Sequence, residues 1–305
     1  MAPTGVLLLA YGSPERPEDV EPYFTHIRGG RTPSAEAVAH LRERYERVGG
    51  GTPLLRITQE VREALEAELN DGAGEPAYRV HAGMKHWHPF AGDVMRGMAA
   101  EGIRRIVVLP LAPHYSHISI GGYRRIVDEA QAALGDPFEI RFVESWHMEP
   151  AFLDLVADRV RAALPAFAAI EPERTVCVFT AHSLPERIRE WRDPYESQLH
   201  ESSEAVAKRL GLRHWRIAWQ SAGSTGEPWI GPDILDELDA MKRAGFAAVL
   251  QVPIGFVSDH LEILYDIDVE AAGRAAELGL AFARTRLPNA DPDFVRTLAR
   301  IVTAA

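Results

Sequence analysis

The sequence is almost without cysteine. Cys177 is its single cysteine, so the chain cannot form an internal disulfide. One thiol also cannot hold an iron–sulfur cluster, which usually takes four thiolates. Cys177 lies in the apolar stretch TVCVFTA, and we interpret it as a small core side chain. The absence of a disulfide framework favours a cytoplasmic protein.

Long apolar runs and an excess of basic residues are also missing. No stretch approaches the roughly 18 apolar residues of a membrane-spanning helix. The N-terminus, MAPTGVLLLAYGSPE, lacks the basic region of a signal peptide. The formal net charge of −11 argues against nucleic-acid or anionic-membrane partners. We therefore predict a cytoplasmic globular protein without stable membrane insertion.

The common nucleotide, zinc and hydrolase signatures are absent as well. The sequence has no G-x-x-x-x-G-K-[ST] motif, and no G-x-G-x-x-G follows the first apolar run. It contains neither HExxH nor CxxC. Ser183 is flanked by A-H-S-L-P rather than by the G-x-S-x-G of a nucleophile elbow. Nucleotide phosphates are thus not the obvious ligand, and we discount a hydrolase.

Short apolar runs alternate with longer amphipathic segments along the chain, which indicates an α/β fold with parallel sheets. A length of 305 residues suffices for two domains, each with its own core. The expected strands are Gly5–Ala10, Tyr78–Gly83, Arg105–Leu111 and Glu139–Glu144 in the first half, and Thr175–Ala181, Trp215–Gln220, Ala247–Ile254 and Gly279–Arg284 in the second.

The two halves align with each other residue by residue. GIRRIVVLPLAPHYSH in the first half corresponds to GFAAVLQVPIGFVSDH, which begins 143 positions later at Gly245. The first strands also match, and they place Tyr11 opposite His182 at an offset of 171. The larger offset means that the first half carries about 28 additional residues between these strands. We therefore predict an internal duplication of one α/β plan.

The extra residues define the expected domain organisation. We assign them to residues 22–53, a predicted helical insertion at the carboxyl ends of the strands, where open α/β sheets bind ligands. We expect a first domain over residues 1–146 and a second over residues 147–290. Asp-Pro opens a last amphipathic helix, over residues 291–304, which is predicted to pack back on the first domain.

His182 is the first candidate for chemistry. It directly follows a buried strand, so its imidazole would lie at the mouth of a parallel sheet, where it could act as a base or a metal ligand. The alternative is a histidine that caps the following helix or bonds to a nearby carbonyl.

A second cluster is acidic. If the chain after Ser258 is helical, Glu262, Asp266 and Glu270 share one face at i, i+4 and i+8. Carboxylates placed this close repel each other unless they are solvated or bind cations. The alternative is a solvent-facing stripe, although Glu262 lies at the end near His182. Histidine with glutamate suits a borderline divalent ion such as Fe²⁺.

The insertion supplies a different signal. Its arginines alternate with aromatic and apolar side chains, which suits a flat hydrophobic ligand that carries carboxylates, because guanidinium groups pair with carboxylates. The alternative is a solvated helix surface. The residues concerned are Arg28, Arg31, Arg44, Arg47, Tyr23, Phe24, Ile27 and Tyr45.

Eight segments together resemble the ferrochelatase family, in order and spacing from about residue 5 to residue 300. They are LLAYGSP, YFTHIRGGR, RYERVGGGTPL, GMKHWHPF, LAPHYS, AHSLPE, WQSAGSTGEPWIGP and PIGFVSDHLEILYD. The nearest resemblance is to the short form of Gram-positive and related bacteria, which metallates coproporphyrin III. It implies two flavodoxin-like (Rossmann-like) domains, each with a four-stranded parallel sheet, and a porphyrin cleft between them.

The resemblance also implies residue roles. His182 matches the essential histidine and Glu262 its partner carboxylate, as catalytic groups and metal ligands. Tyr11 matches a tyrosine that can ligate iron from the opposite face of the porphyrin, and Asp266 and Glu270 would form an acidic path for cations. Positions near the porphyrin are matched by Ile27, Arg28, Arg44, Tyr45, Thr52 and Tyr123, with Thr52 in place of a commoner serine.

The implied activity is insertion of ferrous iron into coproporphyrin III, in haem biosynthesis. Iron is then a substrate, no tightly bound cofactor is expected, and a downstream haem-pathway enzyme is a candidate partner. We expect a neutral His182, with an ordinary pKa near 6.5, to accept a pyrrole proton, and a neighbouring carboxylate to raise that pKa. The alternatives are a protoporphyrin IX ferrochelatase, a cobalt or nickel chelatase, a porphyrin carrier, and a periplasmic-type binding protein.

Overall fold

The computed structural model describes residues 3–72, 74–223 and 226–305, which form two compact units. The first unit comprises Met1–Trp146, Ser258–Leu261 and Pro288–Ala305, and the second comprises His147–Val257 and Glu262–Leu287. Residues 1 and 2 of the expected first domain, and Ser224 and Thr225 of the WQSAGSTGEPWIGP segment, lie outside the described residues.

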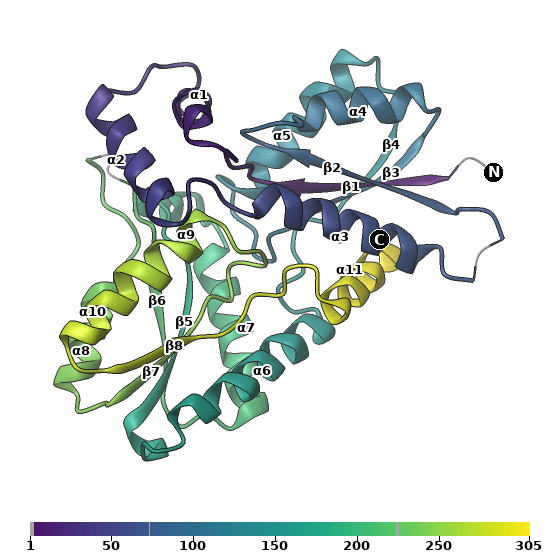
Figure 1. The fold of residues 1–305 in the computed structure, drawn as a ribbon. Helices are drawn as coiled ribbons and strands as arrows, with labels where there is room; N and C mark the ends of the chain where they lie inside the picture. The colour runs from purple at the N-terminus through teal and green to yellow at the C-terminus, as the bar shows by residue number, and fades with distance from the viewer. Residues whose placement is uncertain (1–2, 73, 224–225) are drawn as a thin grey trace. The chain divides into compact units, whose positions relative to one another are not determined.

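The elements of the first unit are drawn in Figure 1. In chain order they are β1 (Thr4–Ala10), η1 (Pro17–Asp19), α1 (Val20–Ile27), α2 (Ala35–Arg47), α3 (Leu54–Leu69), β2 (Tyr78–Met84), α4 (Ala91–Ala100), β3 (Arg105–Pro110), α5 (Ile120–Ala133), β4 (Glu139–Phe142) and, from the end of the chain, α11 (Pro292–Ala304).

The remaining elements follow residue 149. They are α6 (Pro150–Ala163), η2 (Leu164–Phe167), η3 (Pro172–Arg174), β5 (Thr175–His182), η4 (Glu186–Trp191), α7 (Tyr195–Leu210), β6 (Trp215–Gln220), α8 (Ile234–Arg243), β7 (Ala248–Val252), α9 (Leu261–Leu264), η5 (Asp266–Ala271), α10 (Ala272–Glu277) and β8 (Ala281–Arg284).

The two sheets share one topology. Their strand orders are β2-β1-β3-β4 and β6-β5-β7-β8, and every pairing is parallel. Gly102 and Gly245, which the internal alignment equates, both have positive φ angles, of 80° and 91°. Each lies just before the matching strand, β3 or β7, where a left-handed residue without a side chain ends the preceding helix. The predicted α/β class and its duplication are confirmed.

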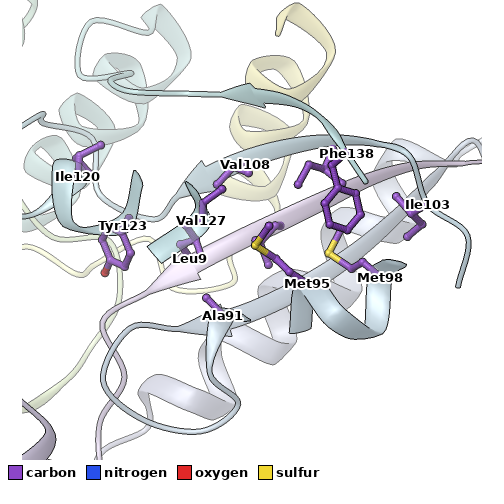
Figure 2. Packing of buried hydrophobic residues seen from close by; sticks show 12 residues of the cluster. Leu9, Ala91, Met95, Met98, Ile103, Val108, Ile120, Tyr123, Val127 and Phe138 are labelled. Carbon is purple, nitrogen blue, oxygen red and sulfur yellow. The ribbon is translucent and has the colours of Figure 1, made fainter. Parts of the chain in front are cut away.

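One face of the first sheet is covered by α4 and α5. Leu7 and Leu9 of β1 alternate along the strand and pack against Met95 and Met98 of α4, as Figure 2 shows for three of these residues. The aromatic ring of Phe138 closes the same cluster. Helix α3 contacts β2 and also packs against α11, whose buried stripe of apolar residues makes it amphipathic.

The second sheet has an equivalent core. Val176 and Val178 of β5 pack with Leu238 and Met241 of α8 and with Ala275 of α10. Helices α6 and α7 pack on each other, and α7 contacts β6. Cys177 lies between the two valines and is buried, which confirms its interpretation as a core side chain.

The strand positions were predicted closely, with differences of one or two residues at the ends. β1 begins at Thr4 rather than Gly5, β5 extends through His182, and β8 begins at Ala281 rather than Gly279. Gly279 has a φ of 63°, a left-handed conformation that belongs to the turn after α10 rather than to a strand. The residues at which a strand ends depend on its pairing register with the neighbouring strand, and the local sequence pattern does not specify that register.

The first unit has more chain between its first two strands than the second unit has. β1 is followed by α1, α2 and α3 before β2, whereas β5 is followed by η4 and α7 before β6. Ser34 caps α2 by accepting a hydrogen bond from the Ala37 amide at 3.2 Å. α1 and α2 lie within the expected insertion or at its edge. No helix among the described residues is long and apolar enough to cross a bilayer.

Candidate active site

His182 and Glu262 form a close pair in the second unit. His182 is the last residue of β5, and Glu262 belongs to the short helix α9. The His182 Nε2 atom lies 3.3 Å from Glu262 Oε1, and about a third of each side chain is exposed. The end of β5 and the helix α9 after β7 thus bring an imidazole and a carboxylate together at a partly solvent-exposed position. The indole of Trp229 lies beside the imidazole, with ring centroids 6.3 Å apart.

Hydrogen bonds define the orientation of His182. Its Nδ1 atom is bonded to the carbonyl oxygen of Ser183. A carbonyl can only accept, so Nδ1 carries a hydrogen and Nε2 is the nitrogen that can exchange a proton. The Tyr195 hydroxyl donates to the His182 carbonyl at 3.0 Å, and the Ser183 hydroxyl donates to the Ile230 carbonyl at 2.7 Å. The backbone around the histidine is therefore held on both sides.

The charge of Glu262 changes the protonation of His182 in the direction expected from the sequence. Burial by itself would lower the pKa of His182, but the charge of Glu262 and its hydrogen bond, with the Ser183 carbonyl and the charge of Asp266, raise the pKa to about 9. At neutral pH the pair is then an imidazolium and a carboxylate that share one proton. The expected rise of the pKa beside a carboxylate is found, but the carboxylates outweigh desolvation so far that the imidazole is protonated rather than neutral at pH 7.

The acidic segment after Glu262 is not a continuous α-helix. The Glu270 amide bonds to the Tyr265 carbonyl at 3.0 Å, a five-residue step, and Asp266–Ala271 is a π-helix. Asp266 is buried, and its carboxylate accepts a hydrogen bond from the Ser221 hydroxyl. Glu270 is exposed. The expectation of an α-helical i, i+4, i+8 stripe is therefore wrong, because the wider turn separates the environments of Asp266 and Glu270.

Tyr11 occupies the matching strand end of the first unit. It follows β1, and 43% of it is exposed. Backbone bonds from Lys85 to Ala10 and from His86 to Tyr11, of 2.9 and 2.8 Å, place the chain after β2 beside it. The His86 ring lies 4.6 Å from the Tyr11 ring, and Lys85 Nζ lies 6.0 Å from the Tyr11 ring centroid and 5.4 Å from that of Tyr123.

Lys85 and His86 lie beside Tyr11 but were not predicted as candidate site residues. Burial, with the nearby charge of Arg125, lowers the pKa of Lys85 to about 8. Burial, with the charges of Lys85 and His26, lowers the pKa of His86 to about 3. His86 is therefore neutral at pH 7. The signal for both residues was their position directly after an apolar strand, the same signal that identified His182.

Three hydroxyl groups come together near Tyr11. The Ser13 hydroxyl lies 2.9 Å from the Tyr45 hydroxyl and accepts from Thr52 at 2.8 Å. Gly51 allows this approach, because a side-chain carbon there would lie only 2.2 Å from the Glu15 carbonyl oxygen. We call Ser13, Tyr45 and Thr52 the hydroxyl cluster. Tyr45 and Thr52 were predicted as site residues, whereas Ser13 was not.

The other predicted binding residues are distributed over several elements of the first unit. Arg28 caps the end of α1, is exposed, and has its guanidinium 5.8 Å from the centre of the Phe24 ring. Ile27 and Arg44 are partly exposed, at the ends of α1 and α2. Tyr123 is buried in α5, and burial, with a smaller effect of Tyr11, raises the pKa of its phenol.

Metal-binding potential rests on the pair rather than on a larger cage. Among residues 3–72, 74–223 and 226–305, no group of three or more histidine, cysteine, aspartate or glutamate side chains is arranged to hold a metal ion. His182 and Glu262 offer one nitrogen and one carboxylate.

Comparison with known proteins identifies the family. A family model described as Ferrochelatase matches residues 3–305. The chain belongs to the ferrochelatase family. It is 48% identical over 302 residues to a protein named ferrochelatase from Herpetosiphon aurantiacus, with 99% of each chain covered.

Two other ferrochelatase relatives carry a more specific name. The chain is 44% identical to a coproporphyrin III ferrochelatase of Anoxybacillus flavithermus, covering 98% of this chain and 95% of that one. It is 41% identical to the coproporphyrin III ferrochelatase of Bacillus subtilis, covering 98% and 96%.

Solved chelatases share the fold of this chain. The structure of SirB from Bacillus subtilis with Fe³⁺ superimposes with a TM-score of 0.61 at 9% identity, covering 99% of this chain and 95% of that one. A sirohydrochlorin chelatase SirB in complex with cobalt, from Bacillus subtilis subspecies spizizenii, gives 0.55 at 9% identity, covering 99% and 94%. At this identity the likeness shows the fold alone.

Family membership places the chain among the metal chelatases of haem biosynthesis, with a porphyrin and iron as substrates. The predicted family is confirmed. The chemistry of this reaction sets the requirements for the site: two pyrrole N–H bonds break, the macrocycle's nitrogens bind the metal, and two protons leave without any change in the oxidation state of ferrous iron.

Proposed function

We propose that the chain inserts ferrous iron into coproporphyrin III and that His182 and Glu262 are its catalytic pair. The observation that carries the catalytic assignment is the 3.3 Å contact between His182 Nε2 and Glu262 Oε1 in a partly open place at the end of β5. The names of relatives at 41–44% identity over nearly the whole chain support the substrate.

The pair is suited to proton transfer from a pyrrole nitrogen. In the free protein it holds one proton, because the pKa of His182 is raised to about 9. That proton must pass to solvent, which the partly exposed ring permits, before Nε2 can accept a pyrrole proton. Glu262 stabilises the imidazolium that forms, so proton acceptance is favourable near neutral pH. Two cycles of acceptance and release account for both protons.

The same two side chains are proposed to receive the metal. Fe²⁺ is a borderline ion that accepts imidazole and carboxylate ligands, and a cation next to His182 would favour loss of its proton. Asp266 and Glu270 lie further along the same segment, and we propose that they attract hydrated iron toward Glu262. Tyr11, exposed at the end of β1, is the proposed ligand of iron within the bound macrocycle.

Porphyrin recognition is assigned to the first unit. Coproporphyrin III carries four carboxylates, and each of them needs a polar or cationic partner when water is removed. Arg28 and Arg44 supply guanidinium groups, and the hydroxyl cluster supplies donors at fixed distances. Ile27 and Tyr123 are the proposed apolar and aromatic contacts. No cofactor is needed, since the reaction moves protons and a metal but no electrons.

Protoporphyrin IX is the alternative substrate, and it carries two carboxylates rather than four. A porphyrin or haem carrier is the alternative function. One experiment separates the three. Purified protein is mixed anaerobically with Fe²⁺ and with either porphyrin, and the Soret and Q bands are followed with time.

We expect many turnovers of coproporphyrin III and slow or no reaction of protoporphyrin IX. Preference for protoporphyrin IX would overturn the substrate and keep the catalytic pair. Stoichiometric binding without turnover, under conditions in which the iron remains ferrous, would overturn the enzymatic proposal in favour of a carrier.

A further inference from the structure

The end of β6 holds the segment that carries Glu262. Gln220, the last residue of β6, is 1% exposed. Its Nε2 atom donates a hydrogen bond of 2.8 Å to the carbonyl oxygen of Glu262. Gln220 also pairs with His182 across the β5–β6 ladder. One buried side chain therefore links the position of the carboxylate residue to the strand next to the histidine.

The orientation of the Gln220 amide follows from its buried partners. Its Oε1 atom accepts from the Thr180 hydroxyl at 3.0 Å and from Gln251 Nε2 at 3.1 Å. Gln251 Nε2 also donates to the Thr180 hydroxyl oxygen at 3.1 Å, so the single Thr180 hydrogen is available to Gln220. A flipped Gln220 amide would place its donors against these two donors. The amide nitrogen consequently faces Glu262.

Ser221, the next residue after Gln220, makes a second link to the same segment. Its acceptor is Asp266, four residues after Glu262. The φ angle of Ser221 is 63°, in the left-handed region that residues other than glycine, asparagine and aspartate adopt rarely. In this conformation its hydroxyl donates to the Asp266 carboxylate. A conformation that costs free energy persists when its surroundings determine it, and such residues gather at functional sites.

The first link lies just before an irregular turn, and the second lies at its start. The Tyr265 carbonyl accepts from the amides of both Val269 and Glu270 at 3.0 Å, so four- and five-residue steps compete at the start of the π-helix. A backbone with two available turns does not by itself define the position of Glu262. External bonds at Glu262 and at Asp266 remove that freedom.

We propose that Gln220 and Ser221, the β6 end pair, are positioning residues that hold Glu262 within reach of His182. The proposal rests on the proposed role of His182 and Glu262 in catalysis. The β6 end pair touches neither iron nor porphyrin in this proposal. It acts through the backbone of Glu262 and the carboxylate of Asp266, so it should affect the rate of metal insertion rather than porphyrin binding.

The first test compares Gln220→Met with Thr180→Val. Gln220→Met keeps the side-chain length and removes the donor to Glu262. Thr180→Val keeps the shape, removes a bond to Gln220 Oε1, and leaves the bond from Gln220 to Glu262. We expect Gln220→Met to lower kcat by about 10- to 100-fold, the loss expected when a reacting group is displaced by up to about 1 Å, with porphyrin KM within about two-fold.

The matched variant defines the outcome that would overturn the proposal. Thr180→Val should lower Tm but keep kcat within about two-fold of the wild type, because the bond to Glu262 remains. If both variants lost kcat equally, in proportion to their loss of Tm, the hydrogen bonds among Thr180, Gln220 and Gln251 would serve stability alone and the positioning role would be overturned. A Gln220→Met protein with wild-type kcat would overturn it as well.

Ser221 provides a second test that does not depend on the stability of Gln220→Met. Ser221→Gly removes the donor to Asp266 and also relieves the left-handed conformation. We expect Tm at or above the wild-type value together with a kcat lowered about 5-fold or more. Ser221→Ala should lower both Tm and kcat. Wild-type kcat in Ser221→Gly would overturn the role of Ser221.

His182→Ala is measured beside these variants to separate the two proposals. Wild-type turnover in His182→Ala removes the catalytic pair itself, whatever the β6 end pair does. Loss of turnover in His182→Ala with wild-type kcat in Gln220→Met and Ser221→Gly keeps the catalytic pair and overturns the positioning role alone.

Discussion

His182 Nε2 and Glu262 Oε1 lie 3.3 Å apart although they come from different kinds of element, the last residue of a strand and a short helix that precedes a π-helix. The contact makes the proton affinity of the histidine depend on the carboxylate of Glu262, a residue whose backbone carbonyl accepts a hydrogen bond from the Gln220 side chain at the end of β6. Two predictions concern this pair, one concerns the hydroxyl cluster of the first unit, and one concerns the buried Cys177.

Removing the imidazole should abolish turnover. We expect His182→Ala to lower kcat by about 10²- to 10⁴-fold, the usual contribution of a general acid–base group. Porphyrin affinity should change little, because the proposed carboxylate partners lie in the first unit. A Soret titration measures the affinity and anaerobic iron insertion measures kcat. His200→Ala, at an exposed position of α7, is the matched control, and wild-type turnover in His182→Ala would contradict the assignment.

Neutralising the partner should change the protonation of His182. The pKa of His182 is raised to about 9, chiefly by Glu262 acting against burial, so Glu262→Gln should lower this pKa toward or below its ordinary value of 6.5. A histidine that is protonated more readily in the folded state stabilises that state fully below about pH 6.5, and this contribution is lost as the pH rises through about 9.

Two measurements check the protonation change. An NMR titration of the His182 ring should give a lower pKa in Glu262→Gln than in the wild type. The Tm difference between the two proteins should be largest near pH 6 and should shrink by pH 9.5. An unchanged pKa of His182 in Glu262→Gln would show that the carboxylate is not the cause of the raised value.

Breaking the hydroxyl cluster should weaken porphyrin binding. Thr52→Val keeps the shape of the side chain but removes the donor to Ser13, and a lost hydrogen bond in such a cluster costs about 1 kcal/mol. We expect the porphyrin Kd to rise about five-fold, with kcat at saturation nearly unchanged. Thr52→Ser retains the hydroxyl and should bind like the wild type. Equal affinity in all three proteins would remove Thr52 from the porphyrin site.

Cys177 should matter for stability and not for activity. It is 2% exposed, and burial raises the pKa of its thiol to about 12, so the thiolate that reacts with alkylating reagents is scarce. Native protein should resist iodoacetamide until it unfolds. Cys177→Ser should lower the free energy of unfolding by about 1–3 kcal/mol, since a hydroxyl replaces a thiol in an apolar core. Loss of kcat in a folded Cys177→Ser protein would contradict this role.

Much of the architecture could be predicted from the sequence because its signals are local. Buried parallel strands are short apolar runs, and all eight expected strands are present with no end displaced by more than two residues. The equivalence of Gly102 with Gly245 predicted two copies of one plan, and both glycines have the positive φ that such a turn requires. His182 could be identified because a polar residue directly follows an apolar strand.

Other parts of the site could not be predicted because they depend on packing. The spacing of Glu262, Asp266 and Glu270 fits an α-helix, and nothing in it indicates the five-residue step that buries Asp266 and leaves Glu270 exposed. The sequence predicts Gln220 and Ser221 only as the end of a strand and the residue after it. Their bonds to Glu262 and Asp266 join segments more than forty positions apart.

The sequence by itself therefore determined the class of fold, the duplication and the identities of the proposed catalytic side chains, since side-chain chemistry and hydrophobic periodicity are properties of the chain. The tertiary structure alone decided the protonation of His182 and the position of Glu262. A pKa depends on the balance between desolvation and nearby charge, and a backbone position depends on bonds from distant residues. Both exist only after the chain has folded.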